Sequence, residues 1–470
     1  MNLALVLLAV YSALLVGVGL WIARLVKGSG EFFVAGRRLS VPLLFSTVLA
    51  ANIGAGSTIG AAGQAYRDGL SAWWWNGSAA LGSLVLAFVV GPRIWRIARE
   101  HNLYTAGDFL EWRYGRSVRG VIAALIWVGT LFILAGQLLA GVAILEVVAG
   151  VPRWGGALIG GAVMTTYFVA GGLLSSAWVN LVQLAVLLAG FGVAVPLIVS
   201  DVGGLSALRG VAETAPGFTD VMHSTGPGSG WAFLFLLAPN FMISPGLVQK
   251  AYGARDERTV RIGIGLQAVV LGVFALLPVL IGMAARAAHP DVAVRDQVLP
   301  LMFTEHLPPL LGSVALAAVF SAEVSTCDAI LFMLSTSLSQ DLYKRFVNPQ
   351  ASDARVLQVA RMAALAGGTL GVLLAVSLPP SVIAALSIFY ALVAVSLFVP
   401  VVGGLFVRRA GTREALFAIV AGVTVRVGLQ IFNDGRGVGL VDPTLLGTLS
   451  AAVAYVVTLG LRPSSSKRHD

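Results

Sequence analysis

The sequence is poor in cysteine and in charge. Cys327 is the only cysteine among 470 residues, so no disulfide can form within the chain and its redox compartment stays open. Only 11% of the residues are charged, whereas 57% are hydrophobic and the mean hydropathy is +0.88. These values exclude a water-soluble globular protein and are typical of a polytopic membrane protein.

The sequence lacks the motifs of nucleotide binding and of metal-dependent or nucleophilic catalysis. The sequence has no glycine-rich phosphate loop ending in Lys and Ser/Thr, and its longest polar stretches, 93–119 and 201–230, are too short for a nucleotide-binding domain. No histidine lies within a well-defined hydrophobic span, and no metal-ligand or nucleophile–base spacing is visible. We therefore do not expect an enzyme, and the energy for any transport should come from an ion gradient.

Long apolar segments recur along the whole chain. A segment of about 20 residues is needed to cross roughly 30 Å of hydrocarbon. We count thirteen such segments, at 3–23, 41–66, 71–92, 120–148, 155–173, 178–200, 231–249, 262–285, 303–338, 358–378, 381–407, 414–432 and 440–461. Because backbone polar groups must find partners within the segment in lipid, each is expected to be a helix. The segment at 303–338 is too long to lie entirely in the bilayer.

The basic residues predict how the chain is inserted. The formal net charge is +9, which in a soluble protein would suggest a nucleic-acid partner. With the N-terminus placed outside, 24 of the 31 Lys and Arg face the cytoplasm, so insertion explains the excess and no nucleic-acid partner is expected. Residues 1–25 lack the basic start of a secretory signal and are followed by Lys27, which favours a retained helix. The sequence thus predicts a plasma-membrane protein with a cytoplasmic C-terminus.

Two of the predicted spans contain helix-breaking residues. The second span carries AANIGAGSTIG at 50–60, where glycines crowd a helix that also holds Asn52, Ser57 and Thr58. Its glycines could instead permit close helix packing. Five spans later, Pro239 and Pro245 interrupt a hydrophobic helix beside Ser244. Interrupted helices at matching positions are expected where two inverted repeats enclose a binding site near the middle of the membrane.

The ninth span carries polar residues at helical spacing. Ser321, Ser325 and Asp328 fall on one stripe, in line with Ala318, and so give one face of the helix a row of oxygen atoms. Glu323 lies about half a turn away. An ionisable side chain inside a span is a candidate for proton transfer or ion coupling, but Glu323 and Asp328 could equally pair with a neighbouring helix for structural reasons.

These residues resemble the sodium:solute symporter family, which includes carriers of glucose, proline, pantothenate and monocarboxylates. The resemblance covers nearly the whole chain, and its most specific parts are AANIGAGSTIG, VQKAYGARDERTVRIG at 248–263 and the polar span at 318–346. It implies an all-α integral membrane protein of about 13 helices with a leucine-transporter-like fold. One transporter domain, 1–470, would then contain two inverted five-helix repeats, 41–200 and 231–409.

The resemblance also implies a sodium site. In the family, Na⁺ acts as the coupling ion and is held by two carbonyl groups that correspond to Ala50 and Ile53, and by oxygens that correspond to Ala318 and Ser321. Members commonly have a second hydroxyl directly after the first, whereas this chain has Ala322. Ser325, a water or Glu323 would then complete the site, or the site would bind sodium weakly or prefer a proton. Asn180 replaces the Asp of members that bind an additional sodium, which favours one coupling ion.

A small organic solute is the predicted cargo. Positions that resemble the sugar site of the glucose carriers hold smaller groups here, at Ser57, Asn76 and Ser387, so a compact carboxylate or amino acid is expected. Further predicted contacts are Asn52, Thr58, Phe241, Ser244 and Tyr390. The expected partners are this solute and the lipid bilayer, with no obligatory protein partner. Two alternatives are a proton-coupled symporter and a membrane sensor, although the tail after residue 461 is too short to signal alone.

Overall fold

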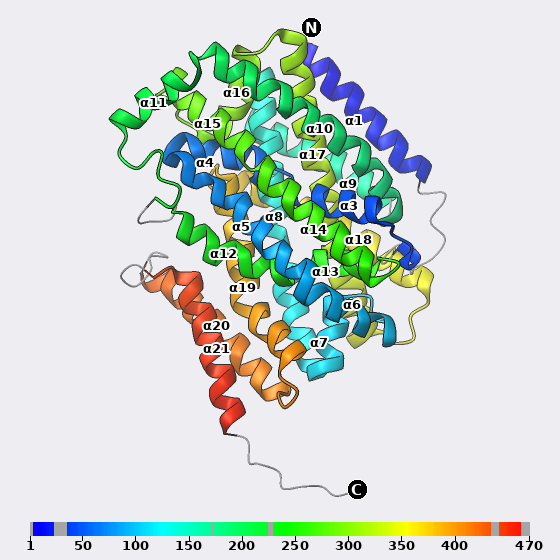
Figure 1. The fold of residues 1–470 in the computed structure, drawn as a ribbon. Helices are drawn as coiled ribbons and strands as arrows, with labels where there is room; N and C mark the ends of the chain where they lie inside the picture. The colour runs from blue at the N-terminus through cyan, green and yellow to red at the C-terminus, as the bar shows by residue number, and fades with distance from the viewer. Residues whose placement is uncertain (1–2, 23–34, 171–172, 224–228, 434–440, 462–470) are drawn as a thin grey trace, which may run out of the picture.

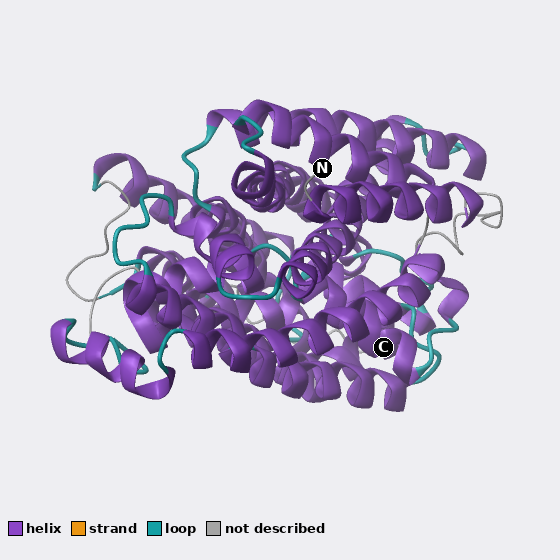
Figure 2. Cartoon of the chain, turned by 90° about the horizontal axis from the view of Figure 1, so that it is seen from above, coloured by secondary structure: helices purple, strands orange, loops and turns teal. Residues whose placement is uncertain are grey.

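The computed structural model describes residues 3–22, 35–170, 173–223, 229–433 and 441–461, and these residues form helices and loops without a β-strand (Figures 1 and 2). Ten helical segments among them are long and apolar enough to cross a membrane. Shorter apolar helices occur at Leu3–Leu14 and Val41–Asn52. The all-helical prediction is therefore confirmed, whereas the count of thirteen spans is not.

The first half of the chain begins with α1 (Leu3–Ile22) and η1 (Ala35–Arg37). The second predicted span, 41–66, is divided between three elements: α3 (Val41–Asn52), η2 (Gly56–Gly60) and α4 (Ala61–Asp68). The elements that follow are η3 (Gly69–Ala72), α5 (Trp73–Val85), η4 (Leu86–Val90), α6 (Gly91–Glu100), α7 (Ala106–Tyr114), α8 (Arg116–Ala149), α9 (Arg153–Ala170), α10 (Leu173–Asp201) and α11 (Gly204–Thr214).

The second half begins with another divided helix. It consists of α12 (Gly230–Ile243) and α13 (Pro245–Tyr252), which are separated at Ser244, where the backbone is not helical. The remaining elements are α14 (Glu257–Phe274), α15 (Leu276–Ala288), η5 (Arg295–Gln297), α16 (Val298–Glu305), α17 (Pro309–Thr336), η6 (Ser337–Val347), α18 (Asp353–Ser377), α19 (Val382–Phe406), α20 (Thr412–Phe432) and α21 (Pro443–Gly460). The two predicted breaks are thus confirmed, except that Pro239 lies within the continuous helix α12 and only Pro245 stands at the second break.

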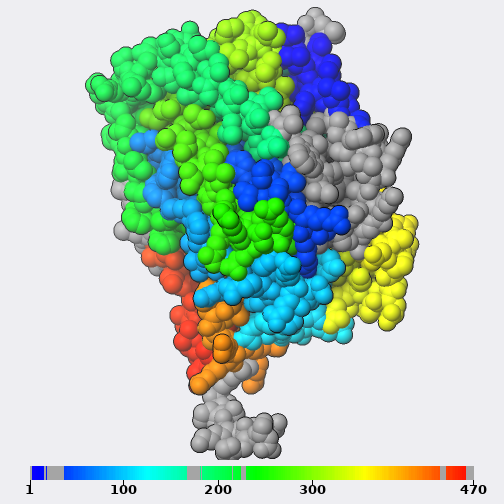
Figure 3. Space-filling model, turned by 45° about the vertical axis from the view of Figure 1, so that its right-hand side comes forward, coloured from blue at the N-terminus to red at the C-terminus, as the bar shows by residue number. Residues whose placement is uncertain are grey.

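Two helices form the centre of the bundle and two lie at its edge. In the most apolar window of α8 and in that of α17, 83% of the residues are buried, compared with 22% in α20 and in α21. Figures 1 and 3 show this C-terminal pair in orange and red along one side of the molecule. Its exposed side chains, such as Phe417, Val420 and Val456, are large and apolar, as lipid contact requires. The polar stripe predicted in the ninth span therefore lies on a central helix.

Glycines let the divided helices approach their neighbours closely. Gly282 of α15 faces the backbone of Ala62 on α4, and Gly63 faces the backbone of Arg295. Small residues allow such contacts between helices where lipid gives no hydrophobic driving force. The packing interpretation of the glycines in the second span therefore also holds, because Gly63 packs closely while Gly54 lies in the break.

A buried ion cluster fastens the end of the bundle that carries α6 and α7. The guanidinium of Arg119 on α8 contacts Asp108 at 2.8 Å, Glu111 at 2.8 Å and Asp341 at 2.7 Å. Thr105 donates a further hydrogen bond of 2.6 Å to Asp341. Since a buried cation is stable only when it is paired, the cluster holds α7, α8 and η6 in one arrangement.

Gly282→Ala should destabilise the protein. An added Cβ would fall against the carbonyl group of Ala62, and overpacking of this kind costs about 1–3 kcal/mol. The thermal unfolding midpoint in detergent is expected to fall. Gly272→Ala is the matched control, because its Cβ would lie 3.7 Å from Ala80, an ordinary contact. Equal midpoints for the two variants would contradict the close approach of α15 and α4.

The stability of the connection before α16 should depend on pH. Burial raises the pKa of Asp296 from its usual 3.8 to about 6, although the backbone N–H of Val382 donates to it. Since the folded state binds this proton more tightly, stability should decrease as pH rises from about 4 to about 6, by on the order of 3 kcal/mol. Asp296→Asn should abolish this decrease in the unfolding midpoint, whereas Asp291→Asn, at an exposed position on the same connection, should retain it. A decrease that persists in Asp296→Asn would refute the assignment.

Candidate functional site

The break between α3 and η2 releases backbone groups in the middle of the bundle. The last regular bond of α3 runs from the N–H of Ile53 to Leu49. The next two N–H groups turn elsewhere: that of Gly54 donates to Ser57 Oγ at 2.8 Å, and that of Ala55 donates to Gln137 Oε1 on α8 at 2.8 Å. In a continuous helix these two groups would bond to the carbonyls of Ala50 and Ala51. The break therefore leaves carbonyl oxygens free for other partners.

Three carbonyl oxygens gather around one hydroxyl of α17. Thr326 Oγ1 lies 2.9 Å from the oxygen of Ala50, 3.2 Å from that of Ile53 and 3.0 Å from that of Ala322. Ser325 Oγ lies 3.5 Å from the oxygen of Ala50. One hydroxyl has a single hydrogen and can satisfy only one of three acceptors at a time. The cluster is thus rich in neutral oxygen, which is the ligand that a hard monovalent cation requires in place of water.

The predicted metal ligands are only partly brought together. Ala50, Ile53 and Ser325 lie in the oxygen cluster, but Ser321, one turn earlier on α17, contacts a different group. Its hydroxyl accepts a short hydrogen bond from Tyr11 on α1, and Gln183 on α10 donates to the same Tyr11 at 2.6 Å. Ala318 lies almost one further turn away. Ser321 therefore lies one helical turn from the oxygen cluster, on the same face of α17 as Ser325, and the roles of Ser321 and Ala318 as metal ligands remain predictions.

The two carboxylates of α17 have different surroundings. Glu323 is fully buried, neither of its oxygens has a hydrogen-bond partner among the described residues, and it faces Gly141 of α8. Asp328 is 7% exposed and lies close enough to the buried ammonium of Lys250 to interact with its charge. Lys250 also donates to Thr47 on α3 at 2.9 Å. A role for either carboxylate in coupling remains a prediction.

A cavity opens beside the oxygen cluster. Its atom-free space is about 430 Å³ when the part open to solvent is included, but only about 50 Å³ of it can hold the centre of a water-sized molecule. Residues from α3, η2, α5, α8, α12, α17 and α19 surround it: Ala51, Asn52, Gly54, Gly56, Ser57, Trp75, Asn76, Ala79, Ile133, Gln137, Leu237, Phe241, Thr326, Ile330, Leu386 and Tyr390. No charged side chain is among them. The cavity can therefore orient a solute by amides, hydroxyls and backbone groups, but not by an ion pair.

Five of the eight predicted solute contacts line this cavity, namely Asn52, Ser57, Asn76, Phe241 and Tyr390. The other three lie elsewhere. Thr58 donates to the carbonyl of Gly54 at 2.8 Å, Ser244 forms the second helix break, and Ser387 is a half-buried residue of α19 outside the lining.

The sequence did not single out several lining residues, among them Gln137 and Thr326. Nothing in the local sequence marks Gln137, because its role depends on a hydrogen bond from the N–H of Ala55, in the break between α3 and η2. Trp75 stands in a run of three tryptophans that resembles an interfacial belt.

Aromatic rings form one wall of the cavity. The ring of Tyr390 lies 5.7 Å from that of Phe241 and 5.9 Å from that of Trp75, both measured between centroids. Phe233 packs edge-on against Trp75 at 5.4 Å. Such contacts hold large rings in fixed positions, so the apolar side of the cavity is preformed.

Most of this chain matches the model of a single protein family. The model of the sodium:solute symporter family matches residues 32–422. A sodium/glucose cotransporter of Vibrio parahaemolyticus is 25% identical over 467 residues, which cover 90% of this chain and 84% of that protein. A sodium/pantothenate symporter of Escherichia coli is 29% identical over 440 residues, which cover 90% and 89%.

Solved structures show the same fold. A Na⁺-coupled sialic acid symporter in a substrate-bound, outward-open state superimposes with a TM-score of 0.83 at 18% identity, over 98% of both chains. A nucleobase-cation-symport-1 family transporter in a closed conformation gives a TM-score of 0.60 at 15% identity, over 93% of this chain and 94% of that one. The leucine-transporter-like fold expected from the sequence is thus supported, and nothing in these comparisons supports the proton-coupled alternative.

Proposed function

We infer, because this chain belongs to the sodium:solute symporter family, that it uses a sodium gradient to carry a small organic solute across the cytoplasmic membrane. The family consists of transporters, so the chain is an integral membrane transporter and not an enzyme. The observation that carries the proposal is the oxygen cluster at Thr326, where three carbonyl groups converge on one hydroxyl.

We place the sodium ion in this cluster. Its ligands would be the carbonyl oxygens of Ala50, Ile53 and Ala322 and the hydroxyls of Ser325 and Thr326. Ser325 and Thr326 would supply the two adjacent hydroxyls that members of the family commonly have, which Ser321 and Ala322 do not provide. A neighbouring carboxylate is then not needed to complete the site. Five neutral oxygen ligands would replace the hydration shell of the ion without placing a charged side chain in the site. Sodium could then bind and leave reversibly.

The solute would occupy the cavity lined by Asn76, Gln137 and Tyr390. We propose a carboxylate or amino acid of modest size. Helical structure resumes at Gly56, and the N-terminal end of a helical segment favours a negatively charged group even where no Lys or Arg is present. The aromatic wall would hold the apolar part of the solute.

Sodium and solute would be coupled through shared residues. Thr326 belongs both to the oxygen cluster and to the cavity wall, and Asn52 and Gly54 at the helix break also face the cavity. An ion that fixes the break would fix the cavity wall as well. Each ligand must then raise the affinity of the other by the same factor. One coupling ion per cycle is proposed, since Asn180 supplies no negative charge for another.

The architecture fits two inverted repeats, 41–200 and 231–409, in which the divided helices α3/α4 and α12/α13 occupy matching positions. Such pairing places a binding site at the interface of the repeats. We propose that the N-terminus lies outside and the C-terminus in the cytoplasm, as the distribution of basic residues predicts. The bilayer and the solute are the partners that this mechanism requires.

Sodium should stabilise the protein and drive uptake. A thermal-shift screen of small carboxylates and amino acids, in sodium and then in choline, should identify a solute that raises the unfolding midpoint mainly in sodium, because a ligand that binds the native state stabilises it. Uptake of that solute into proteoliposomes should follow an inward sodium gradient and persist when a protonophore removes the proton gradient. Uptake that depends on the proton gradient alone would overturn the proposal.

Thr326→Val should weaken sodium binding more than Ser321→Ala. The valine keeps the shape of Thr326 but removes its oxygen, so the sodium concentration for half-maximal stabilisation should rise about tenfold, which corresponds to about 1.4 kcal/mol. Ser321→Ala removes the hydroxyl that accepts from Tyr11 and should leave the sodium requirement near that of the wild type. The opposite order would return the site to Ser321.

A further inference from the structure

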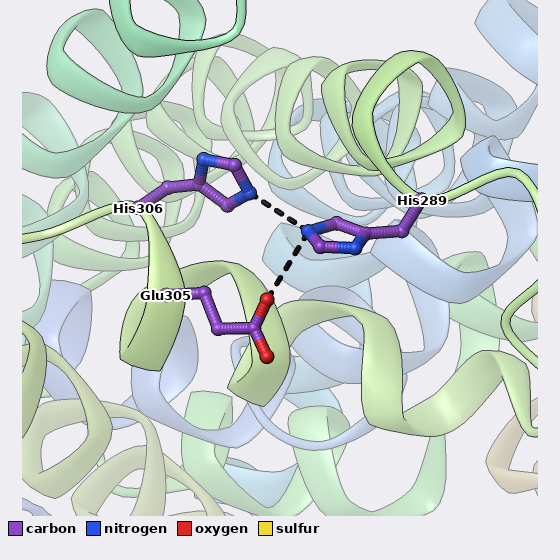
Figure 4. A group of neighbouring side chains, drawn as sticks. All are labelled: His289, Glu305 and His306. Atoms are coloured by element: carbon purple, nitrogen blue, oxygen red, sulfur yellow. Dashed lines mark hydrogen bonds and ion pairs between the residues drawn. The ribbon is translucent and has the colours of Figure 1, made fainter.

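A second group of possible ligands lies at the end of the molecule where the chain begins. Figure 4 shows His289, which follows α15, pointing toward Glu305 and His306 at the end of α16. The Nε2 atoms of the two histidines are 2.8 Å apart, and Glu305 Oε2 lies 3.4 Å from His289 Nε2. One ligand atom from each residue lies within 4.8 Å of the others.

Asp201, which is not one of the three possible ligands, fixes the orientation of the His306 ring. Its Nδ1 donates to Asp201 at the end of α10, with 2.7 Å between Nδ1 and Oδ2. This bond selects the tautomer whose Nε2 carries a lone pair, and that lone pair points toward His289. A carboxylate behind the distal nitrogen of a histidine is the arrangement that orients histidine ligands in zinc sites.

Two of the three spacings between ligand atoms fit a tetrahedral metal ion with small adjustments. Zinc lies about 2.0–2.1 Å from histidine nitrogen and about 2.0–2.2 Å from carboxylate oxygen, so tetrahedral ligand atoms are roughly 3.3 Å apart. The distance from Glu305 to His289 already matches, and the two Nε2 atoms would have to separate by about half an ångström. The side chain of His306 is 15% exposed and that of Glu305 is 50% exposed, so an ion can enter from solvent.

The local charge also favours a cation. Among the described residues, the ion-pair partners of Asp201 and Glu305 are these two histidines, and no Lys or Arg pairs with either carboxylate. The group therefore holds two carboxylates beside two imidazoles. A divalent ion would compensate these charges in a way that a proton shared between the histidines cannot.

We propose that His289, Glu305 and His306 bind a zinc-type divalent ion, with Asp201 as the residue that positions His306. Two imidazoles and one carboxylate leave a fourth position for water. The ion would join the end of α15 to the end of α16, which the hydrogen bond from His306 to Asp201 already ties to α10. It would also act on α4, because Tyr66 of α4 donates to the carbonyl of His289 at 2.8 Å and accepts from the N–H of Val292 at 3.0 Å.

The test uses the full-length protein, purified without a polyhistidine tag and freed of metal with a chelator. Titration with Zn²⁺, followed by calorimetry, should show one saturable site per chain. The unfolding midpoint should rise with zinc in the wild type. His306→Ala should abolish both effects, and Asp201→Asn should weaken the affinity about 10–100-fold.

His101→Ala is the matched control, since His101 is an exposed histidine that follows α6, outside the group. It should bind zinc as the wild type does. Co²⁺ gives a measurement that needs no variant, because a tetrahedral site with histidine ligands has characteristic visible absorption. Absence of saturable zinc binding to the wild type, or equal binding by His306→Ala and His101→Ala, would overturn the proposal.

Discussion

The structure depends on one interruption of backbone hydrogen bonding. At residues 53–55 the chain stops being a helix in a buried part of the bundle. Its N–H groups find Ser57 and Gln137, while its carbonyl oxygens turn toward Thr326. In lipid such groups would cost several kcal/mol each if left unpaired, so the break can persist only inside a bundle that supplies partners. The surrounding helices supply the hydrogen-bond partners that water would supply in a soluble protein.

The partners come from the central helices and not from the edge. α8 supplies Gln137 and α17 supplies Thr326, and these are the two helices whose apolar windows are most buried. α15 approaches α4 through Gly282, so the second part of the divided helix is held from the other side. The break is therefore held by contacts from several elements. An ion at the break and a solute in the cavity consequently meet the same small set of residues.

The sequence was sufficient to predict the helix break but not its partner residues. Glycines beside Asn52 predict the loss of helix, and Pro245 beside Ser244 predicts the second break, because both follow from local backbone chemistry. The register on α17 cannot be predicted in this way. Ser321 and Ser325 are four residues apart and lie on the same face, so helical periodicity gives no reason to prefer one turn. Only the position of α3 against α17 brings Thr326, and not Ser321, to the freed carbonyls. His289 and His306 are likewise brought together by the connection before α16. Their separation of 17 residues in the sequence matches no common metal-ligand spacing.

The most direct test of this account is to locate the ion. Electron cryomicroscopy of the protein in nanodiscs, in sodium chloride and in choline chloride, would compare density at the break. We expect a sodium-dependent density in contact with the carbonyl oxygens of Ala50 and Ile53 and the hydroxyl of Thr326. A sodium-dependent density beside Ser321 and Ala318, with the oxygens around Thr326 unchanged between the two salts, would contradict the account.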